Sequence, residues 1–338
     1  MDSDSAPIDV RAALLFRPGT DLHAHHAPDE DLCIEQARFS DILSEWLQEG
    51  APLILHGRDI LHFEVLEQSI HDRCAPIDPV FRGLVANLCG SERGFRVSVQ
   101  VSPRIGIFAH RHADEYDVLD RVRHWTEDVG LAMYLAKPGA ARRVRSEVHV
   151  GNTWGEATRD DGFDNLLRRG KKADAWPQLR ELPLSTVWRW LKASPSVETN
   201  FATDAVGRAL HAASHTLYAR SFVTELVWVM VGLESLFTSS EGGLLHQVRE
   251  RGQALLGSSG RASKDISEMY RIRSKFLHGK LGFPGPHYAD YGGDEFRQWT
   301  GDMLQALATG RAMLIASLQE LVVRDWHELE FGVSVAGR

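Results

Sequence analysis

The chain has 338 residues, of which 43% are hydrophobic and 25% are charged, with a formal net charge of −8. This composition is ordinary for a globular protein and excludes a chain dominated by disorder. The length leaves room for two domains, each with its own core. The excess acid lies in residues 1 to 50, which hold 11 acids and 3 bases; the remaining chain holds 35 of each. The net charge argues against indiscriminate coating of nucleic acid, but local basic patches remain possible.

The sequence predicts neither a secretory leader nor a membrane span. Its first residues are acidic and lack the cationic and apolar regions of a secretory leader. The longest apolar stretch, near 226–233, is far shorter than a bilayer span. Cys33, Cys74 and Cys89 form no CxxC pair, which is typical of free thiols in a reducing compartment. We therefore expect a cytoplasmic protein that does not enter a membrane.

The first part of the chain predicts a mixed α/β domain over residues 1–136 that senses or regulates. Apolar residues at helical spacing indicate helices, and alternation or short apolar runs between turn residues indicate strands. The expected helices cover 32–47 and 114–129, and the expected strands cover 95–101, 105–109 and 131–136.

A basic stretch follows, and we expect it to be an irregular connection over residues 137–180. Residues 137–172 hold nine bases against five acids, with several glycines and little periodicity. Such a segment could follow a phosphate backbone, although charge clusters in loops more often only face water.

The second half of the chain predicts an all-helical bundle over residues 181–325, which makes the whole chain α+β. Glycines at 257 and 279 are placed to end helices, and Asp294 is placed to cap a long one. The expected helices cover 184–192, 203–218, 222–237, 244–256 and 262–278, followed by the long helix from about 294.

One acid, Glu234, interrupts a nearly apolar run within the helix 222–237. An unpaired buried carboxylate is costly, so Glu234 should find a cationic or hydrogen-bonding partner or emerge into a cleft. Arg271, Arg273 and His278 are the candidates of the right kind. A salt bridge that only fixes the packing of two helices is the structural alternative to a catalytic role.

The most informative segment is 269–279, where Arg273 precedes His278 by five residues at an expected helix end. Arginine binds phosphate, and histidine exchanges protons near neutral pH, so the pair suits phosphodiester cleavage. A helix C-terminus favours the cationic form of a histidine. Arginine and histidine pairs at similar spacings recur in the chain, so the position of this pair at a helix end, and not its spacing alone, indicates a functional site. On an ideal helix residues 273 and 278 lie about 140° apart, which keeps Arg271 open as the phosphate-binding arginine.

These residues resemble the Apea-like branch of the HEPN domains. The resemblance covers roughly residues 180 to 325, and it rests on 182–190, 233–237, a helix beginning near Leu244, and 270–279. By position, Arg273 and His278 match the motif arginine and histidine, Ser274 the polar residue after the arginine, and Glu234 the helix acid. Serine stands where catalytic relatives often carry asparagine or another polar amide or acid. Lys280 stands where HEPN partners of nucleotidyltransferase antitoxins carry a modifiable tyrosine.

The resemblance implies a helical bundle that forms a homodimer, joins two arginine and histidine motifs in one cleft, and often cleaves RNA without a metal. Many such proteins act as toxins or in antiviral defence. In this chain the RNA 2′-hydroxyl would attack phosphorus while His278 moves protons, Arg273 stabilises the charged intermediate, and Glu234 assists. Arg271, Ser274, Lys275 and Lys280 are expected to bind the RNA, and no cofactor is expected.

Two other functions stay open. The bundle could be a catalytically inactive HEPN module that binds nucleic acid or a partner protein. Alternatively, His23 and His25 form an HxH pattern of the kind that holds a metal in amidohydrolases, although Pro18 and Gly19 favour a polar loop there.

Overall fold

The structure is a computed structural model of the full chain. It describes the backbone of residues 8–18, 53–55, 59–69, 93–101, 115–138, 141–150, 153–159, 176–198, 201–217, 219, 221–239, 242–282 and 293–332. Side-chain surroundings are described for residue 124 and for residues 127–138. They are also described for every range above that begins at residue 176 or later, apart from residue 198. Two compact units are present: Met1–Tyr134 with Gly139–Asp161, and Leu135–Pro138 with Gly162–Arg338.

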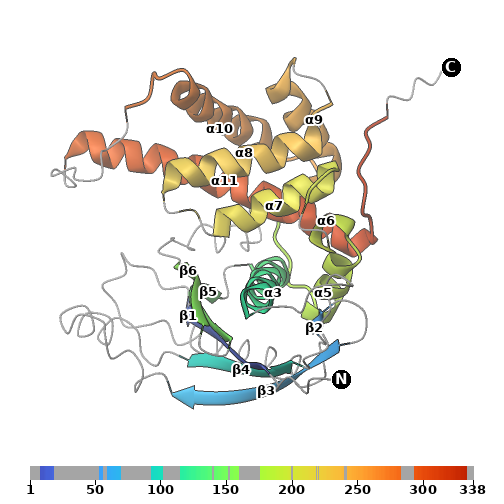
Figure 1. The fold of residues 1–338 in the computed structure, drawn as a ribbon. Coiled ribbons are helices and arrows are strands. Elements are labelled where there is room, and N and C mark those ends of the chain that lie inside the picture. Colours follow the sequence, from blue (N-terminus) through green and yellow to red (C-terminus); the bar gives the residue numbers. More distant parts are fainter. Residues whose placement is uncertain are drawn as a thin grey trace. The chain divides into compact units, whose positions relative to one another are not determined.

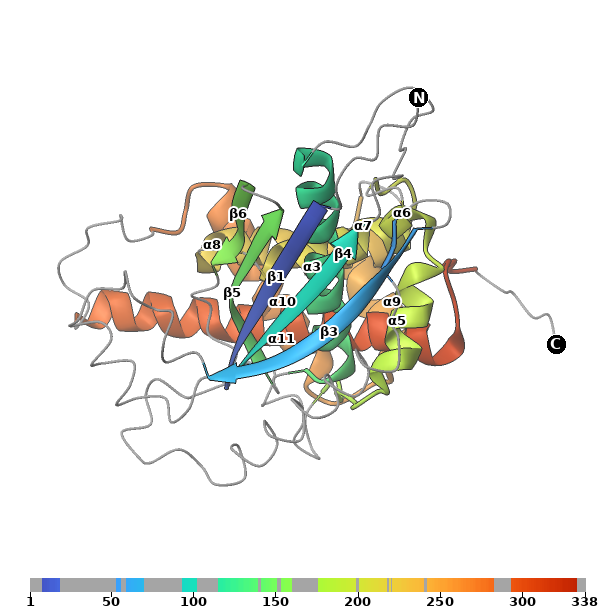
Figure 2. The ribbon, with the colours of Figure 1, turned by 60° about the horizontal axis from the view of Figure 1, so that its bottom comes forward.

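The backbone of the first unit forms a sheet and most of one helix, α3 (Glu115–Ala136). The strands pair in the order β2-β3-β4-β1-β5-β6, and each neighbouring pair is antiparallel (Figure 2). Their bounds are β1 (Ile8–Pro18), β2 (Leu53–Leu55), β3 (Asp59–Ser69), β4 (Arg93–Val101), β5 (Ala141–Val150) and β6 (Thr153–Arg159).

The second unit is built from helices (Figure 1). Their bounds are α5 (Leu184–Lys192), α6 (Pro195–Glu198), α7 (Ala205–Leu217), α8 (Phe222–Phe237), α9 (Leu244–Leu256), α10 (Ala262–Leu277) and α11 (Asp294–Arg324). The bounds expected for α5, α8 and α9 are confirmed, and those of α7 and α10 differ by one or two residues. These helices carry strong apolar periodicity and are bounded by glycine or proline, which are the signals that sequence patterns report best.

Helix α11 is the centre of this unit. Every residue from Thr309 to Val322 is buried, including the polar Ser317 and Gln319. Helices α7, α8, α9 and α10 all contact it. A helix that is surrounded in this way needs mostly apolar residues over its central turns, and the sequence provides them apart from a few buried polar residues such as Arg311 and Gln319.

Two glycines allow the helices to approach closely. A Cβ at Gly310 of α11 would lie 2.4 Å from Cγ1 of Val229 on α8 and 2.9 Å from the sulfur of Met269 on α10. A Cβ at Gly232 of α8 would lie 2.9 Å from Leu314 on α11. Real Cβ atoms do not sit this close to a neighbour, so a side chain at either position would require Val229, Met269 or Leu314 to shift.

The expected fold class needs correction. Among the residues whose side-chain surroundings the structure describes, 73% are helical, in eight helices, with no strand or sheet. The assignment of α+β overall, with a mixed α/β N-terminal domain before the bundle, is therefore wrong for this part of the chain, which is all-helical. For the strands of the first unit, the structure describes the backbone and its pairing but not the packing of the side chains.

Three local expectations are also wrong. Residues 131–136, expected as a strand, form the end of α3, because a short apolar run fits a buried helix as well as a strand. Residues 141–159, expected as irregular, contain β5 and β6. Asp294 is the first residue of α11 and not its N-cap, since Gly293 takes that position and Asp294 instead accepts a hydrogen bond from Arg297. The segments 32–47 and 105–109 lie outside the described residues.

Among the described helices, α11 alone is long and apolar enough to cross a bilayer by length and composition. Buried residues make up 94% of its apolar window, and the central helix of a bundle shows the same pattern.

Candidate functional site

Helix α10 ends in a turn that places His278 just beyond its last residue. Gly279 adopts a left-handed conformation with φ of 64°. Its backbone N–H donates to the carbonyl of Phe276 at 3.0 Å, and that of Lys280 donates to the carbonyl of Lys275 at 2.7 Å. This pair of bonds is a Schellman motif, which glycine favours because it has no Cβ to clash in that conformation. The sequence prediction that Gly279 ends the helix is confirmed.

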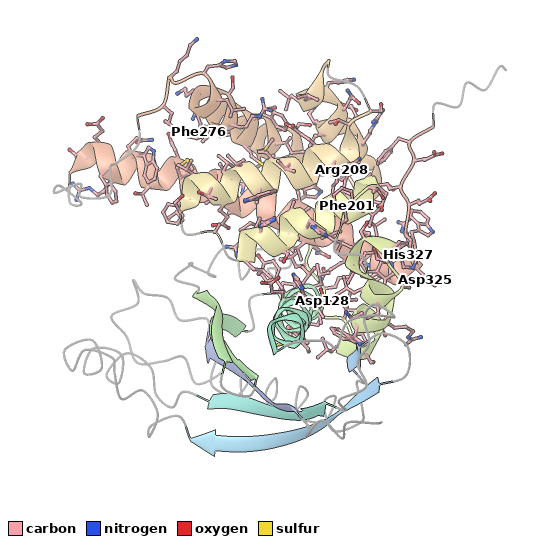
Figure 3. The ribbon with its side chains drawn as sticks, viewed as in Figure 1. Asp128, Phe201, Arg208, Phe276, Asp325 and His327 are labelled. Atoms are coloured by element: carbon pink, nitrogen blue, oxygen red, sulfur yellow. The ribbon has the colours of Figure 1, made fainter. Side chains whose placement is uncertain are left out.

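The imidazole of His278 is exposed, and within the described residues it makes no hydrogen bond or ion pair. Figure 3 shows Phe276, two residues earlier, on the last turn of α10. The first turns of α11 lie near this helix, because Arg271 of α10 is 3.8 Å from Asp302 of α11. His278 is therefore free to meet a molecule that approaches the C-terminal end of α10.

Glu234 on α8 pairs with Arg273 on α10. The Nη2 atom of Arg273 lies 3.2 Å from Oε1 and 3.5 Å from Oε2 of the carboxylate. The side chain of Arg273 is 26% exposed and that of Glu234 is 22% exposed, so the pair is neither buried in the core nor fully in water. The expectation that Glu234 finds a cationic partner is confirmed, whereas the catalytic roles of both residues stay predictions.

Tyr270 completes this group. Its hydroxyl donates to Oε1 of Glu234 at 3.3 Å, and the residue is only 7% exposed. Burial, together with the negative charge of Glu234, raises the pKa of Tyr270 above its ordinary value. The hydroxyl therefore stays protonated and remains a donor at physiological pH.

Arg271 is occupied on the other side of α10. Its guanidinium forms a two-point hydrogen-bonded ion pair with Glu268, one turn earlier, and it also faces Asp302. The hydrogen bonds from Arg271 hold the pKa of the Glu268 carboxyl below its usual value. The Glu268 carboxylate correspondingly raises the pKa of Arg271. The side chains of Arg271 and Glu268 are more than a third exposed, so this pair contributes little to stability.

The structure joins some of the expected site residues and separates others. Glu234 and Arg273 meet, but within the described residues neither Arg273 nor Arg271 contacts His278. For Arg273 the reason is helical geometry, because five residues turn the chain away from the starting face. Arg271 is paired with Glu268 and faces Asp302, and His278 has already left the helix. Of the expected RNA-binding residues, Ser274, Lys275 and Lys280 are all exposed near the same helix end.

Sequence reasoning missed Tyr270. A signal was present, because Tyr270 precedes Arg273 by three residues and side chains at that spacing share a helix face. It also missed the buried ion pair between Glu225 of α8 and Arg311 of α11, whose atoms Oε1 and Nε lie 2.9 Å apart.

The alternative metal site at His23 and His25 lies outside the described residues. Within the part of the chain that the structure describes, no group of three or more histidine, cysteine or acidic residues is arranged to hold a metal.

Comparisons of the chain with protein-family models, with curated proteins and with solved structures gave no match. The likeness to HEPN domains therefore depends on the quoted residues alone.

Proposed function

We propose that this protein is an HEPN-type endonuclease that cleaves single-stranded RNA by attack of the 2′-hydroxyl, without a metal. Many proteins with this resemblance are toxins or antiviral effectors, and we include that role, in the cytoplasm, in the proposal. The observation that carries it is the exposed His278 imidazole at the end of α10, with Arg273 five residues earlier held by a carboxylate.

The chemistry assigns one task to each residue. His278 would take a proton from the 2′-hydroxyl or give one to the departing 5′-oxygen, which is ordinary work for an imidazole. Arg273 would stabilise the extra charge on phosphorus, and Glu234 would orient Arg273. A free 2′-hydroxyl is absent from DNA, so RNA is the expected substrate.

Because Arg273 and His278 do not meet within one chain, the proposed site is shared between two copies. In a homodimer the exposed helix ends of two protomers would face each other, with the RNA phosphate between them. The exposed Ser274, Lys275 and Lys280 surround this position and would contact the RNA backbone.

A second function is favoured by one observation. Both candidate arginines are already paired with carboxylates, Arg273 with Glu234 and Arg271 with Glu268 and Asp302. A guanidinium that is neutralised in this way attracts phosphate less strongly. A catalytically inactive HEPN module that binds RNA or a protein is therefore the alternative.

Cleavage of labelled single-stranded RNA in EDTA, with DNA of the same sequence as reference, tests the proposal. We expect cleavage of the RNA only. His278→Ala should lower the rate at least about 100-fold, because general acid–base catalysis contributes that much. Arg273→Ala should cause a loss of about 100-fold or more.

His246→Ala is the matched control, since His246 is an exposed histidine on α9 of the same unit. Its rate should equal that of the unmodified protein. If the unmodified protein binds RNA but never cuts it, the inactive module is the correct function. Activity that EDTA abolishes would contradict the metal-independent mechanism.

A further inference from the structure

Tyr270 and Arg273 reach the same carboxylate from one face of α10. Glu234 Oε1 lies 3.3 Å from the Tyr270 hydroxyl and 3.2 Å from Arg273 Nη2. The two α10 residues are three positions apart, so they are neighbours on the helix surface. The carboxylate of Glu234 is thus held from α10 by one neutral donor and one cationic donor.

The hydroxyl is a donor that does not titrate in the working range. Tyr270 is buried, and burial, followed by the charge of Glu234, raises its pKa. Its only hydrogen bond within the described residues goes to Glu234. Loss of this hydroxyl would leave Arg273 Nη2 as the one α10 donor to the carboxylate, which would then turn more easily about its last side-chain bond.

The guanidinium of Arg273 depends on that carboxylate for its orientation. Arg273 contacts it through Nη2 alone, and the buried Nε–H has no acceptor in the described part of the chain. An arginine fixed at a single nitrogen can swing when its partner turns, whereas a two-point pair would hold its plane.

We infer that Tyr270 is a positioning residue: through Glu234, its hydroxyl holds the Arg273 guanidinium in the orientation that the proposed RNA cleavage requires. This inference depends on the proposed function for its catalytic meaning. It also favours Arg273 over Arg271 as the phosphate-binding arginine, because Arg271 lies outside the group that Tyr270 and Glu234 form.

The geometric part can be tested without RNA, by the solvent exchange of the Arg273 Nε–H proton in nitrogen-15 NMR. Arg273→Lys identifies the signal by removing it. Tyr270→Phe keeps the ring and removes only the hydroxyl, and we expect it to speed exchange at least about tenfold, the population change that a hydrogen bond to a charged group supports. Tyr134→Phe, at another buried tyrosine, is the control and should leave the exchange unchanged.

The catalytic part is tested by a double-mutant cycle. Tyr270→Phe should lower kcat about tenfold and leave KM within about twofold, because it loosens a group that acts on the transition state. In the Arg273→Lys background the same change should have no further effect. A general loss of stability caused by Tyr270→Phe would instead lower kcat by the same factor in the unmodified and the Arg273→Lys backgrounds.

The outcomes distinguish a failure of the inference about Tyr270 from a failure of the proposed RNA cleavage. Unchanged Nε–H exchange in Tyr270→Phe overturns the inference, whatever the activity. Faster exchange with unchanged kcat also overturns it, because the positioning then has no catalytic effect. Faster exchange in a protein that never cuts RNA refutes the proposed function and leaves the orientation of Arg273 by Tyr270 established.

Discussion

Glu225 and Arg311 form an ion pair that is almost fully buried, with side chains 9% and 8% exposed. It joins α8 to the central helix α11. A buried ion pair adds little net stability relative to an apolar pair, because removing two charges from water costs about as much as their attraction returns. Loss of one partner is different, since it removes the ion pair while the other charge stays buried.

Glu225→Gln should therefore lower the free energy of unfolding by about 3–5 kcal/mol, measured by urea denaturation. The double variant Glu225→Leu with Arg311→Met should recover most of that loss. Glu250→Gln removes an exposed acid on α9 and should change stability by less than about 1 kcal/mol. Equal losses from Glu225→Gln and Glu250→Gln would contradict the assigned cost of burial.

Asp204 caps α7 with a carboxylate whose charge matters. Its Oδ1 accepts from the backbone N–H of Gly207 at 2.6 Å, and its Oδ2 accepts from the Ser196 hydroxyl at 2.8 Å. Burial alone would raise the pKa of Asp204, but these hydrogen bonds outweigh it and hold the pKa below its ordinary value. Because the folded pKa is the lower one, the contribution to stability is complete above the unfolded pKa and is lost as pH falls through the folded pKa.

Asp204→Ala should cost about 1 kcal/mol at neutral pH. The difference from the unmodified protein should shrink as pH falls below about 4, where the unfolded carboxyl begins to take up its proton. Ser221→Ala is the control, because the Ser221 hydroxyl caps α8 through the N–H of Thr224 and does not titrate. Its cost should be similar and independent of pH; a constant cost for Asp204→Ala as well would disprove the linkage.

At the level of the helices, two glycines test how α10 ends and how α11 continues. Gly279 has a positive φ of 64°, which an L side chain adopts only with strain. Gly301 lies exposed within α11, and a Cβ added there meets nothing within 4 Å. Replacement of glycine by alanine should consequently destabilise the protein at position 279 and stabilise it at position 301.

Gly279→Ala should destabilise the protein by about 1 kcal/mol. Gly301→Ala should stabilise it by up to about 1 kcal/mol, because alanine is the better helix former. Thermal unfolding followed by circular dichroism measures both. A shift of Tm in the same direction for the two variants would contradict the helix end described at Gly279.

Buried polar groups join elements that are distant in sequence. The side-chain amide of Gln319 donates to the carbonyls of Leu135 and Arg180, at 2.6 and 2.7 Å, and its oxygen accepts from the N–H of Arg180. The end of α3 is thereby tied to the segment before α5 and to α11. No sequence pattern identifies such a residue, because its partners are backbone atoms.

For the whole molecule, the proposed nuclease requires two chains per site. RNA cleavage per chain should fall on dilution in parallel with the dimer fraction, measured by analytical ultracentrifugation over the same concentrations. Excess His278→Ala protein should inhibit the unmodified protein by forming mixed dimers, and His246→Ala protein should not. Constant activity per chain where the monomer predominates would exclude a shared site.

The sequence by itself determined the helices of the second unit, the end of α10 at Gly279, and the need of Glu234 for a partner. These features depend on local rules: apolar residues every three or four positions, glycine at a left-handed position, and the cost of an unpaired carboxylate. Short apolar runs were less informative, and 131–136 was assigned to a strand although it ends α3.

Only the tertiary structure decided which arginine pairs with Glu234, that Tyr270 joins them, and that Glu225 and Arg311 meet in the core. The physical reason is that each of these contacts joins residues on different helices. Helical periodicity fixes the face on which a residue lies, but the partner of that face depends on how whole helices pack around α11. The separation of His278 from both arginines has a different origin, since all three residues belong to α10 and its end, and it follows from the direction in which the chain leaves that helix.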